Sequence, residues 1–159
     1  MAFRELARKN KAISKEDCIK MLKNEYRGVL SVIGDNGYPY GTPMNHYYNE
    51  EDGCLYFHQG IGGHRLDAIK QNDKVSFCVI DKGIDEYGDG VLMFNSVVVF
   101  GRAEVVSDLK TIIDITTKLS YKFTSDTEYI QREIECFAQK TLLLKLNIEH
   151  ISGKRVREE

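Results

Sequence analysis

The sequence predicts a mainly β protein, an antiparallel barrel that is closed or nearly closed and carries peripheral helices. Three features of the chain predict this class. Six apolar segments of strand length follow one another, and most of their connections are short and rich in Gly, Asn and Asp. Helical spacing of apolar residues is confined to a few separate segments. Antiparallel strands in a small domain protect their edges most completely by closing into a barrel.

The helices and strands are expected in the following order. Ser14 is an N-cap, with Asp17 three residues later as an acidic variant of the capping box, and it starts a helix that ends near Asn24. Residues 35–37, Asp-Asn-Gly, are expected to form a hairpin turn, because the glycine readily takes the positive φ that such a turn requires. Asp108 begins another helix. The remaining expected helices are residues 64–72 and 125–138, and the expected strands are residues 28–33, 38–48, 54–59, 74–80, 91–106 and 142–148.

Length and charge exclude several classes of protein. The chain has 159 residues, 22 basic and 24 acidic side chains and a net charge of −2. We therefore expect a single domain over residues 1–159, with no strongly basic face for nucleic acid. No apolar run approaches the roughly 20 residues of a membrane-spanning helix, and the first ten residues lack the apolar core of a signal peptide. These features predict a cytoplasmic protein that binds neither nucleic acid nor membrane, and the charged residues 153–159 are expected to form a solvated tail.

The cysteines and histidines predict neither disulfides nor a metal site. The four cysteines are widely spaced and form no Cys-x-x-Cys pair, and three of them lie in apolar periodic segments. They are expected to be buried as small apolar side chains. His46 and His58 could face one another across a hairpin, but together with Cys54 or His64 they do not match the compact spacing of zinc ligands.

The segment of residues 56–65 is the best local signal for binding. A strand ends there in a glycine-rich loop, Gly60-Ile61-Gly62-Gly63, and the loop opens a helix that begins with His64 and Arg65. Free backbone N–H groups at a helix start attract anions, glycines let a phosphate approach the backbone, and an arginine can bind two phosphate oxygens at once. The segment matches neither the P-loop nor the dinucleotide fingerprint. A glycine turn with a surface arginine explains the same pattern equally well.

A second candidate is the strand of residues 39–48. Pro43 removes one ladder donor and Gly41 removes a side chain, which indicates an edge strand or a place where something approaches the backbone closely. A flat ligand could lie there. An edge strand with ordinary packing is the simpler explanation.

These segments together resemble a known family. The motifs that carry the resemblance are Gly28-Val29-Leu30, Asp35-Asn36-Gly37-Tyr38-Pro39, Pro43-Met44-Asn45-His46-Tyr47-Tyr48, Leu55-Tyr56-Phe57-His58, Gly63-His64-Arg65-Leu66-Asp67-Ala68-Ile69, Asn72-Asp73-Lys74-Val75 and Ser96-Val97-Val98-Val99-Phe100-Gly101-Arg102-Ala103. Their order and spacing over about residues 4–155 resemble the pyridoxamine 5′-phosphate oxidase-like FMN-binding split barrels, and within them the nitroimidazole-resistance (Nim) branch. The resemblance implies a split β-barrel of the antiparallel Greek-key type, non-covalently bound FMN, and a homodimer whose cofactor sites are shared between the subunits.

The resemblance also implies which positions meet the cofactor. One strand lines the flavin, the next strand end meets the ribityl chain and phosphate, a helix start binds the phosphate, and a polar residue reaches the flavin edge. The implied residues are Pro43, Met44, Asn45 and His46 on the first strand, His58 and Gln59 at the next strand end, His64 and Arg65 at the helix start, and Ser96 at the flavin edge. The family's Ser-Arg-Lys triplet aligns with Gly63-His64-Arg65 in this chain, so phosphate binding is expected to depend on Arg65 and backbone amides.

The chain departs from the vitamin-processing oxidases of this family. Those enzymes carry a C-terminal Trp and Arg near the flavin, whereas this chain contains no Trp. Oxidation of pyridoxamine phosphate is therefore disfavoured. The resemblance implies instead an oxidoreductase that takes electrons from a nicotinamide donor and reduces a small acceptor such as a nitroaromatic. His46 or His58 could tune the flavin or supply a proton, and no residue is assigned as catalytic. Two alternatives stay open: a non-catalytic flavin carrier or redox sensor, and a split barrel that binds haem or a deazaflavin.

Overall fold

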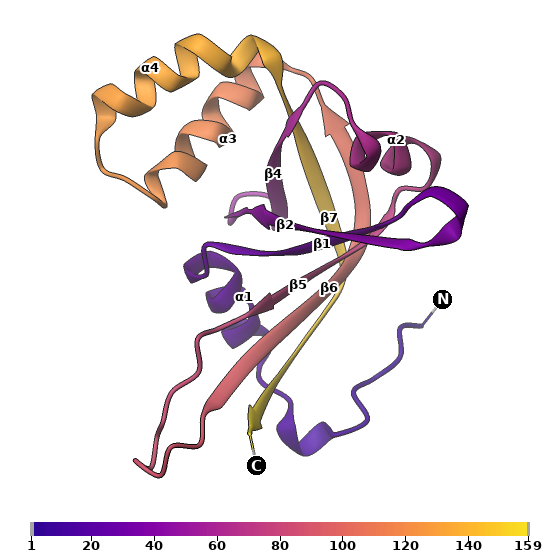
Figure 1. Ribbon diagram of the computed structural model, residues 1–159, viewed down its shortest axis with the longest axis vertical. Helices are drawn as coiled ribbons and strands as arrows, with labels where there is room; N and C mark the ends of the chain where they lie inside the picture. Colours follow the sequence, from indigo (N-terminus) through magenta and orange to yellow (C-terminus); the bar gives the residue numbers. More distant parts are fainter. Residues whose placement is uncertain (1, 159) are drawn as a thin grey trace.

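Seven antiparallel strands form one curled sheet in the computed structural model, which describes residues 2–158 (Figure 1). The strands are β1 (Arg27–Ile33), β2 (Pro39–Asn45), β3 (Tyr47–Asn49), β4 (Cys54–Gly60), β5 (Lys74–Ile80), β6 (Met93–Val106) and β7 (Thr141–Arg157), and their order across the sheet is β2-β1-β5-β6-β7-β4-β3. The helices are α1 (Lys15–Asn24), α2 (His64–Gln71), α3 (Leu109–Tyr121) and α4 (Thr127–Phe137), with short 3₁₀ segments at Lys9–Lys11, Asp35–Gly37 and Ala138–Lys140. The predicted mainly β class and the two hairpins, β1–β2 and β3–β4, are confirmed.

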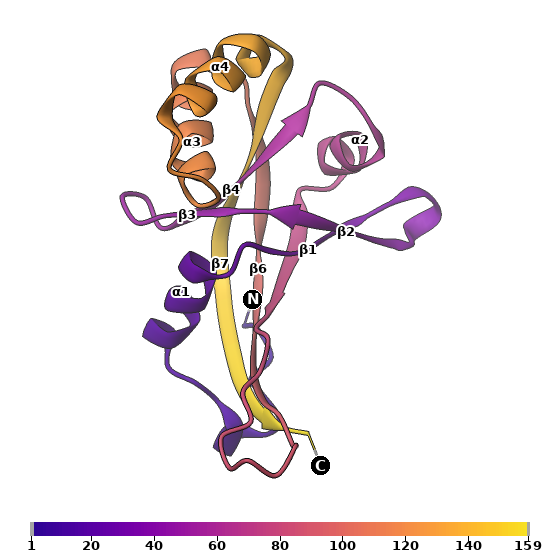
Figure 2. The same ribbon diagram turned by 60° about the vertical axis from the view of Figure 1, so that its left-hand side comes forward.

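The two edges of the sheet are joined by the chain itself at His46. β2 pairs only with β1, and β3 pairs only with β4, so the two strands lie at opposite edges although one residue separates them. Figure 2 shows them end to end across the barrel. The prediction of one continuous strand over residues 38–48 was therefore wrong. The strand breaks because the side chain of His46 is fully buried and bonded to the C=O of Leu22 on α1, which diverts the backbone from the β1 ladder.

The last strand is much longer than the sequence predicted. β7 pairs with β6 from Met93↔Arg157 to Val106↔Leu143, with a register shift at Gly101. A Cβ added at Gly101 would lie 2.1 Å from the C=O of Asn147, so the shift brings the two backbones too close for a side chain. The expected solvated tail was wrong for residues 153–157, because they belong to β7, which is hydrogen-bonded to β6, and Arg157 forms an ion pair with Asp89 in the loop before β6. Glu159, the last residue of the predicted tail, lies outside the described residues.

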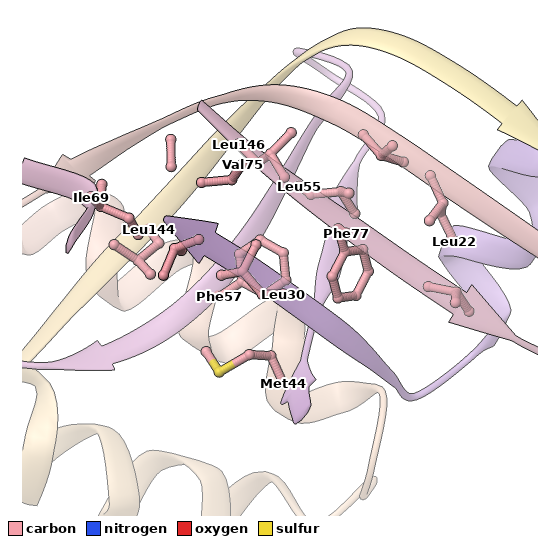
Figure 3. Close-up of a cluster of buried hydrophobic side chains, with 14 of the residues drawn as sticks. Leu22, Leu30, Met44, Leu55, Phe57, Ile69, Val75, Phe77, Leu144 and Leu146 are labelled. Carbon is pink, nitrogen blue, oxygen red and sulfur yellow. The ribbon is translucent and has the colours of Figure 1, made fainter. Parts of the chain in front are cut away.

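The barrel core contains alternate side chains of the strands. Phe57 of β4 and Phe77 of β5 lie at its centre, with an edge-to-face ring contact of 5.0 Å between centroids (Figure 3). α1 contributes Leu22 and α2 contributes Ile69 to the same cluster. The predicted inner face of the α2 helix, Leu66 and Ile69, is confirmed by their burial.

β4 is covered on both faces, which positions the candidate site. Its alternate residues Cys54 and Tyr56 point away from the barrel and pack against Ile112 and Ile115 of α3 in a second apolar cluster. α3 and α4 form a helical hairpin on that side of the sheet (Figure 1). Only the last residues of β4 emerge from this packing, with His58 exposed and Gln59 buried.

The cysteine prediction was correct for only part of the set. Cys18 and Cys54 are buried, whereas Cys78 and Cys136 are exposed, and all four are free thiols. Cys78 is exposed because it alternates with the buried Phe77 and Val79 along β5 and so points out of the barrel. Within residues 2–158, no helix is both long and apolar enough to cross a membrane.

Candidate functional site

Arg65 is held in place by side chains from two strands. It lies in the first turn of α2, where its Nε donates a hydrogen bond to Oε1 of Gln59 on β4 at 2.8 Å and its Nη1 donates to Oγ1 of Thr42 on β2 at 2.8 Å. Gln59 is 5% exposed, and its Nε2 donates to the C=O groups of Gly60 and Gly62 in the adjoining loop. A guanidinium has five N–H donors, so these bonds orient Arg65 and leave further donors for an anion.

The glycine loop before α2 has open space at the positions that side chains would occupy. A Cβ added at Gly60, Gly62 or Gly63 would meet no heavy atom within 4 Å. Gly63 has φ +116°, a conformation that other residues avoid, and it is the N-cap of α2. No side chain caps this helix, whereas Ser14, Asp108 and Asp126 cap α1, α3 and α4. The first N–H groups of α2 therefore have no side-chain acceptor, and Arg65 lies in the same first turn.

His64 fixes the neighbouring hairpin turn. Its ring stacks on Tyr40 of β2, with 4.3 Å between the ring centroids. Its Nε2 accepts a hydrogen bond from the N–H of Asp35 at 3.2 Å, and the Asp35 carboxylate lies 3.7 Å from the same atom. Because Nε2 is an acceptor, neutral His64 carries its proton on Nδ1. His64 thus connects the helix start to the β1–β2 turn.

The predicted residues of β2 lie in different environments. Pro43 is exposed on the edge strand, opposite Val29, which confirms the predicted edge position. Met44 is buried in the barrel core. Asn45 is partly buried, and its Oδ1 accepts a hydrogen bond from Nε of Arg27 at 3.2 Å. Thr42 therefore contacts Arg65 from one face of β2, whereas Pro43 lies on the opposite, outer face beside Val29.

His46 is a core residue in this structure. Its Nε2 donates to the C=O of Leu22 at 2.7 Å, its ring meets the edge of Phe77, and its Nδ1 has no partner among the described residues. Burial, and secondarily the positive charge of Lys122, lower the pKa of His46 to about 3. The ring is neutral at pH 7, and it lies inside the barrel and does not face His58.

Lys122 is a residue that the sequence did not single out. Its Nζ donates to the C=O of Glu25 at 2.6 Å and to the C=O of His46 at 2.8 Å, so it holds the junction between β2 and β3. Burial lowers the pKa of Lys122 to about 8, against an opposing effect of Glu25. The only sequence signal is a cation at a helix C-terminus, because its two partners are distant in the chain.

His58 and Ser96 lie apart from the Arg65 group. His58 is exposed at the end of β4, and desolvation by the surrounding protein, followed by the charge of Arg65, lowers the pKa of its ring. Ser96 is on β6 opposite Ile80, and β1 and β5 separate its strand from β2. The structure thus gathers Gln59, His64 and Arg65 around the glycine loop and adds Tyr40 and Thr42, which the sequence reasoning missed. Across residues 2–158, no group of three or more His, Cys, Asp or Glu side chains could hold a metal ion.

Comparison with known proteins identifies relatives of this fold. A family model described as pyridoxamine 5′-phosphate oxidase matches residues 14–155. No curated protein matches the chain. Among solved structures, the conserved hypothetical protein Rv2991 from Mycobacterium tuberculosis is 16% identical, with a TM-score of 0.80 over 94% of this chain and 90% of that one.

Two further solved structures have names that record a function. A putative 5-nitroimidazole antibiotic resistance protein from Bacteroides thetaiotaomicron is 18% identical, with a TM-score of 0.75 over 93% of this chain and 90% of that one. A FAD-binding protein from Mesorhizobium loti is 26% identical, with a TM-score of 0.62 over 94% of this chain and 97% of that one. The predicted split-barrel fold is confirmed by these similarities.

Proposed function

We propose that this chain, which belongs to the pyridoxamine 5′-phosphate oxidase family, binds FMN non-covalently and passes electrons from a nicotinamide donor to a small oxidised acceptor. A flavin is supported by the family and by the FAD-binding protein that shares this fold at 26% identity. A nitroaromatic acceptor is the specific form of the proposal, in keeping with the name of the matched resistance protein.

The observation that carries the proposal is the group formed by Arg65, Gln59 and the glycine loop. One arginine fixed by two hydrogen bonds, beside one helix start without a side-chain cap, offers charge and N–H donors to a single terminal phosphate. FMN carries one such phosphate at the end of its ribityl chain. The exposed surface of Pro43 on β2 is the wall against which the ring would lie.

Bound FMN would supply the redox chemistry, because its ring accepts a hydride from a nicotinamide and returns two electrons to an acceptor. For a nitroaromatic, one NAD(P)H and one proton provide the two electrons and two protons that convert the nitro group to a nitroso group, and one oxygen leaves as water. Arg65 holds the phosphate in this scheme. His58, whose lowered pKa keeps its ring neutral at pH 7, offers a hydrogen bond rather than a fixed charge to a group near the end of β4.

A homodimer completes the proposed site. Val29, Ile80 and Phe100 are each more than 40% exposed on the outer face of neighbouring strands β1, β5 and β6. Covering this apolar face by a second copy would bury it, and would place Ser96 of the same face beside a cofactor held by the other subunit. Free thiols at all four cysteines accord with a reducing, cytoplasmic compartment.

Replacing Arg65 tests the proposed cofactor site. We expect Arg65→Ala to weaken FMN binding about 10- to 100-fold, because hydrogen bonds to charged groups contribute about 1.5–3 kcal/mol. The measurement is the dissociation constant from quenching of FMN fluorescence, and Arg132→Ala on the exposed face of α4 is the matched control. An FMN affinity that is the same in both variants would remove Arg65 from the phosphate site.

A further inference from the structure

A cavity of about 650 Å³ lies on the outer face of the sheet, under the first residues of the chain. Phe3 forms one side of it, and Lys74 of β5, Phe100 and Arg102 of β6 and Glu149 of β7 contribute to the other. We call it the arm pocket. None of the described residues that line it belongs to the Arg65 group, so the arm pocket is separate from the candidate phosphate site.

The N-terminal arm, residues 2–12, is fixed to the barrel at its end. Ala12 forms a bridge with Lys154, and the N–H of Ile13 donates to the C=O of Gly153 at 3.1 Å. Within the described part of the chain, residues 2–7 form no backbone–backbone hydrogen bond. Figure 1 shows this segment running along the outside of the sheet, away from α1. Because side chains alone hold residues 2–7 in place, the arm can open at a small cost in free energy.

Three parallel aromatic rings meet where the arm touches the sheet. The ring of Phe3 stacks on His150, with 4.9 Å between the centroids and 13° between the planes, and on Phe100, with 5.9 Å and 6°. Phe100 and His150 are paired across β6 and β7, and their rings are 6.2 Å apart and within 16° of parallel. Phe3 is 40% exposed and Phe100 41%. Both rings therefore keep free surface on which a further flat ring can stack.

The charges around the cavity balance one another. The register shift between β6 and β7 leaves Glu149 out of the ladder, and its Oε1 accepts a hydrogen bond from Nε of Arg102 at 3.1 Å. Nη1 of Arg102 also donates to Oδ1 of Asp73 at 2.7 Å. Lys74 supplies a second positive charge to the lining. Two cations thus stand beside two carboxylates, so the site favours a ligand of no net charge over either ion.

The volume of the cavity limits the ligand. Pockets for small molecules span about 300–1,000 Å³, so about 650 Å³ accommodates two fused rings. The space left over borders Lys74 and Glu149, where water can keep the charged groups hydrated. A bicyclic ring on the aromatic side of the cavity is therefore the ligand that fits best.

The arm pocket lies at the border of the apolar face that the proposed dimer covers. From Phe100, β6 runs toward Ser96 opposite Ile80 in one direction and toward Arg102 opposite Lys74 in the other. The cavity lies on the Arg102 side. A second copy that covers Ile80 and a ligand beside Arg102 can therefore be bound together, with Phe100 at the boundary.

We propose that the arm pocket binds a flat aromatic molecule with two fused rings and no net charge, and that this ligand stacks on Phe100 and Phe3 and holds the N-terminal arm against the sheet. Binding and closure of the arm are linked, because a ligand that contacts the arm and the strands together favours the closed arm. The site uses no residue of the proposed cofactor site, so this proposal stands or falls without flavin.

Two probes that differ only in aromaticity test the stacking: 2-naphthol and its saturated counterpart decahydro-2-naphthol, both uncharged at pH 7. Each is titrated into ¹⁵N-labelled full-length protein, and amide shifts are followed. We expect saturable shifts at Phe3, Val75 and Gly101, with 2-naphthol bound about two- to tenfold more tightly. Equal affinities, or saturable shifts confined to other parts of the chain, would overturn the proposal.

A charged probe and the oligomeric state test the remaining parts of the proposal. 2-Naphthoate has the same rings and a carboxylate, and it is expected to bind no more tightly than 2-naphthol; tighter binding would contradict the charge balance. Light scattering at the same protein concentrations reports whether the chain is a monomer or a dimer. A probe that binds only the monomer would make a second copy the occupant of the pocket, and the proposal would be wrong.

Matched variants make the test specific. Phe3→Leu and Phe100→Leu keep an apolar side chain and remove the ring, so each is expected to reduce the preference for 2-naphthol to nearly none. Phe137→Leu is the control, because its side chain is 53% exposed and lies outside the arm pocket. A preference that survives in both Phe3→Leu and Phe100→Leu would refute the stacking.

Proteolysis tests whether the ligand holds the arm. Trypsin cleaves after Arg4 and Arg8, which are exposed in the arm, and cleavage requires the arm to leave the sheet. At ten times its dissociation constant, 2-naphthol is expected to slow cleavage about tenfold, and a free peptide of the arm sequence is the control for effects on trypsin itself. Cleavage at an unchanged rate in the saturated protein would refute the link between the ligand and the arm.

Discussion

Replacing Gln59 with leucine tests whether a buried side chain prepares Arg65 for a phosphate. The variant keeps a side chain of similar size and removes the hydrogen bonds to Arg65, Gly60 and Gly62. Immobilising an arginine costs about 1.5–2 kcal/mol of rotamer freedom, and Thr42 would still restrain the guanidinium from the other side. We therefore expect FMN to bear about 1 kcal/mol of this ordering cost, which corresponds to roughly fivefold weaker binding.

Folding stability should change little in the same variant. Each of the lost hydrogen bonds contributes about 1 kcal/mol, whereas a buried leucine returns about 1.5–3 kcal/mol, so Tm should stay within about 4 °C of wild type. The assay is FMN fluorescence quenching beside a thermal melt. Gln131→Leu is the control, because Gln131 lies on the exposed face of α4 and bonds only Glu135 among the described residues. Wild-type FMN affinity in Gln59→Leu would show that Arg65 needs no support from Gln59, and the reasoning would be refuted.

Three further predictions concern the loop, the core and the outer face. Gly63→Ala should lower Tm by about 2–12 °C, because a residue with a Cβ is strained by about 1–3 kcal/mol at φ +116°. Gly62→Ala is the control and should leave Tm unchanged, because its added Cβ would lie in open space. Equal melting temperatures of the two variants would contradict this prediction. The pKa of Lys122 is lowered to about 8 from an ordinary 10.5, so between these pH values the unfolded chain binds more protons than the folded chain. The free energy of unfolding should therefore rise with pH in this range, by about 1–3 kcal/mol relative to Lys122→Met. Parallel pH profiles of the two proteins in denaturant titrations would count against this prediction. Ile80→Lys on the outer sheet face should convert a dimer to a monomer in light scattering, whereas Ile113→Lys on α3 should not, and an unchanged mass in Ile80→Lys would exclude that face as the interface.

Local signals in the sequence predicted most of the elements correctly. The Ser14 cap, the Asn-Gly turn and the glycine loop depend on residues a few positions apart, and each is present in the structure. Arg65 could be selected for the same reason, because a glycine loop followed by a cation is a pattern that the chain displays without any tertiary contact.

Features that depend on distant partners were missed. His46 interrupts a strand because its ring bonds Leu22, and Lys122 binds backbone atoms of Glu25 and His46. No periodicity records such contacts. The end of β7 was not predicted because its side chains are charged and resemble those of a solvated tail. The strand is held there by backbone pairing with β6, which does not depend on its side chains.

The candidate site was also predicted only in part, because some of its contacts join residues that are distant in the chain. The ladder donor that Pro43 lacks predicted its edge position, but no local signal predicted that Met44 would turn into the core. Gln59 was selected as a phosphate contact, and the structure shows it as the residue that orients Arg65. Thr42 was assigned no role, because its bond to Arg65 spans 23 positions in the chain.

The most direct test of a flavin protein is to bind the flavin to it. Protein freed of cofactor should be mixed with excess FMN, separated from unbound dye by gel filtration, and measured for flavin absorbance against chain concentration. The proposed site predicts one FMN per chain that travels with the protein. A colourless protein peak, with all of the flavin eluting as free dye, would contradict the account.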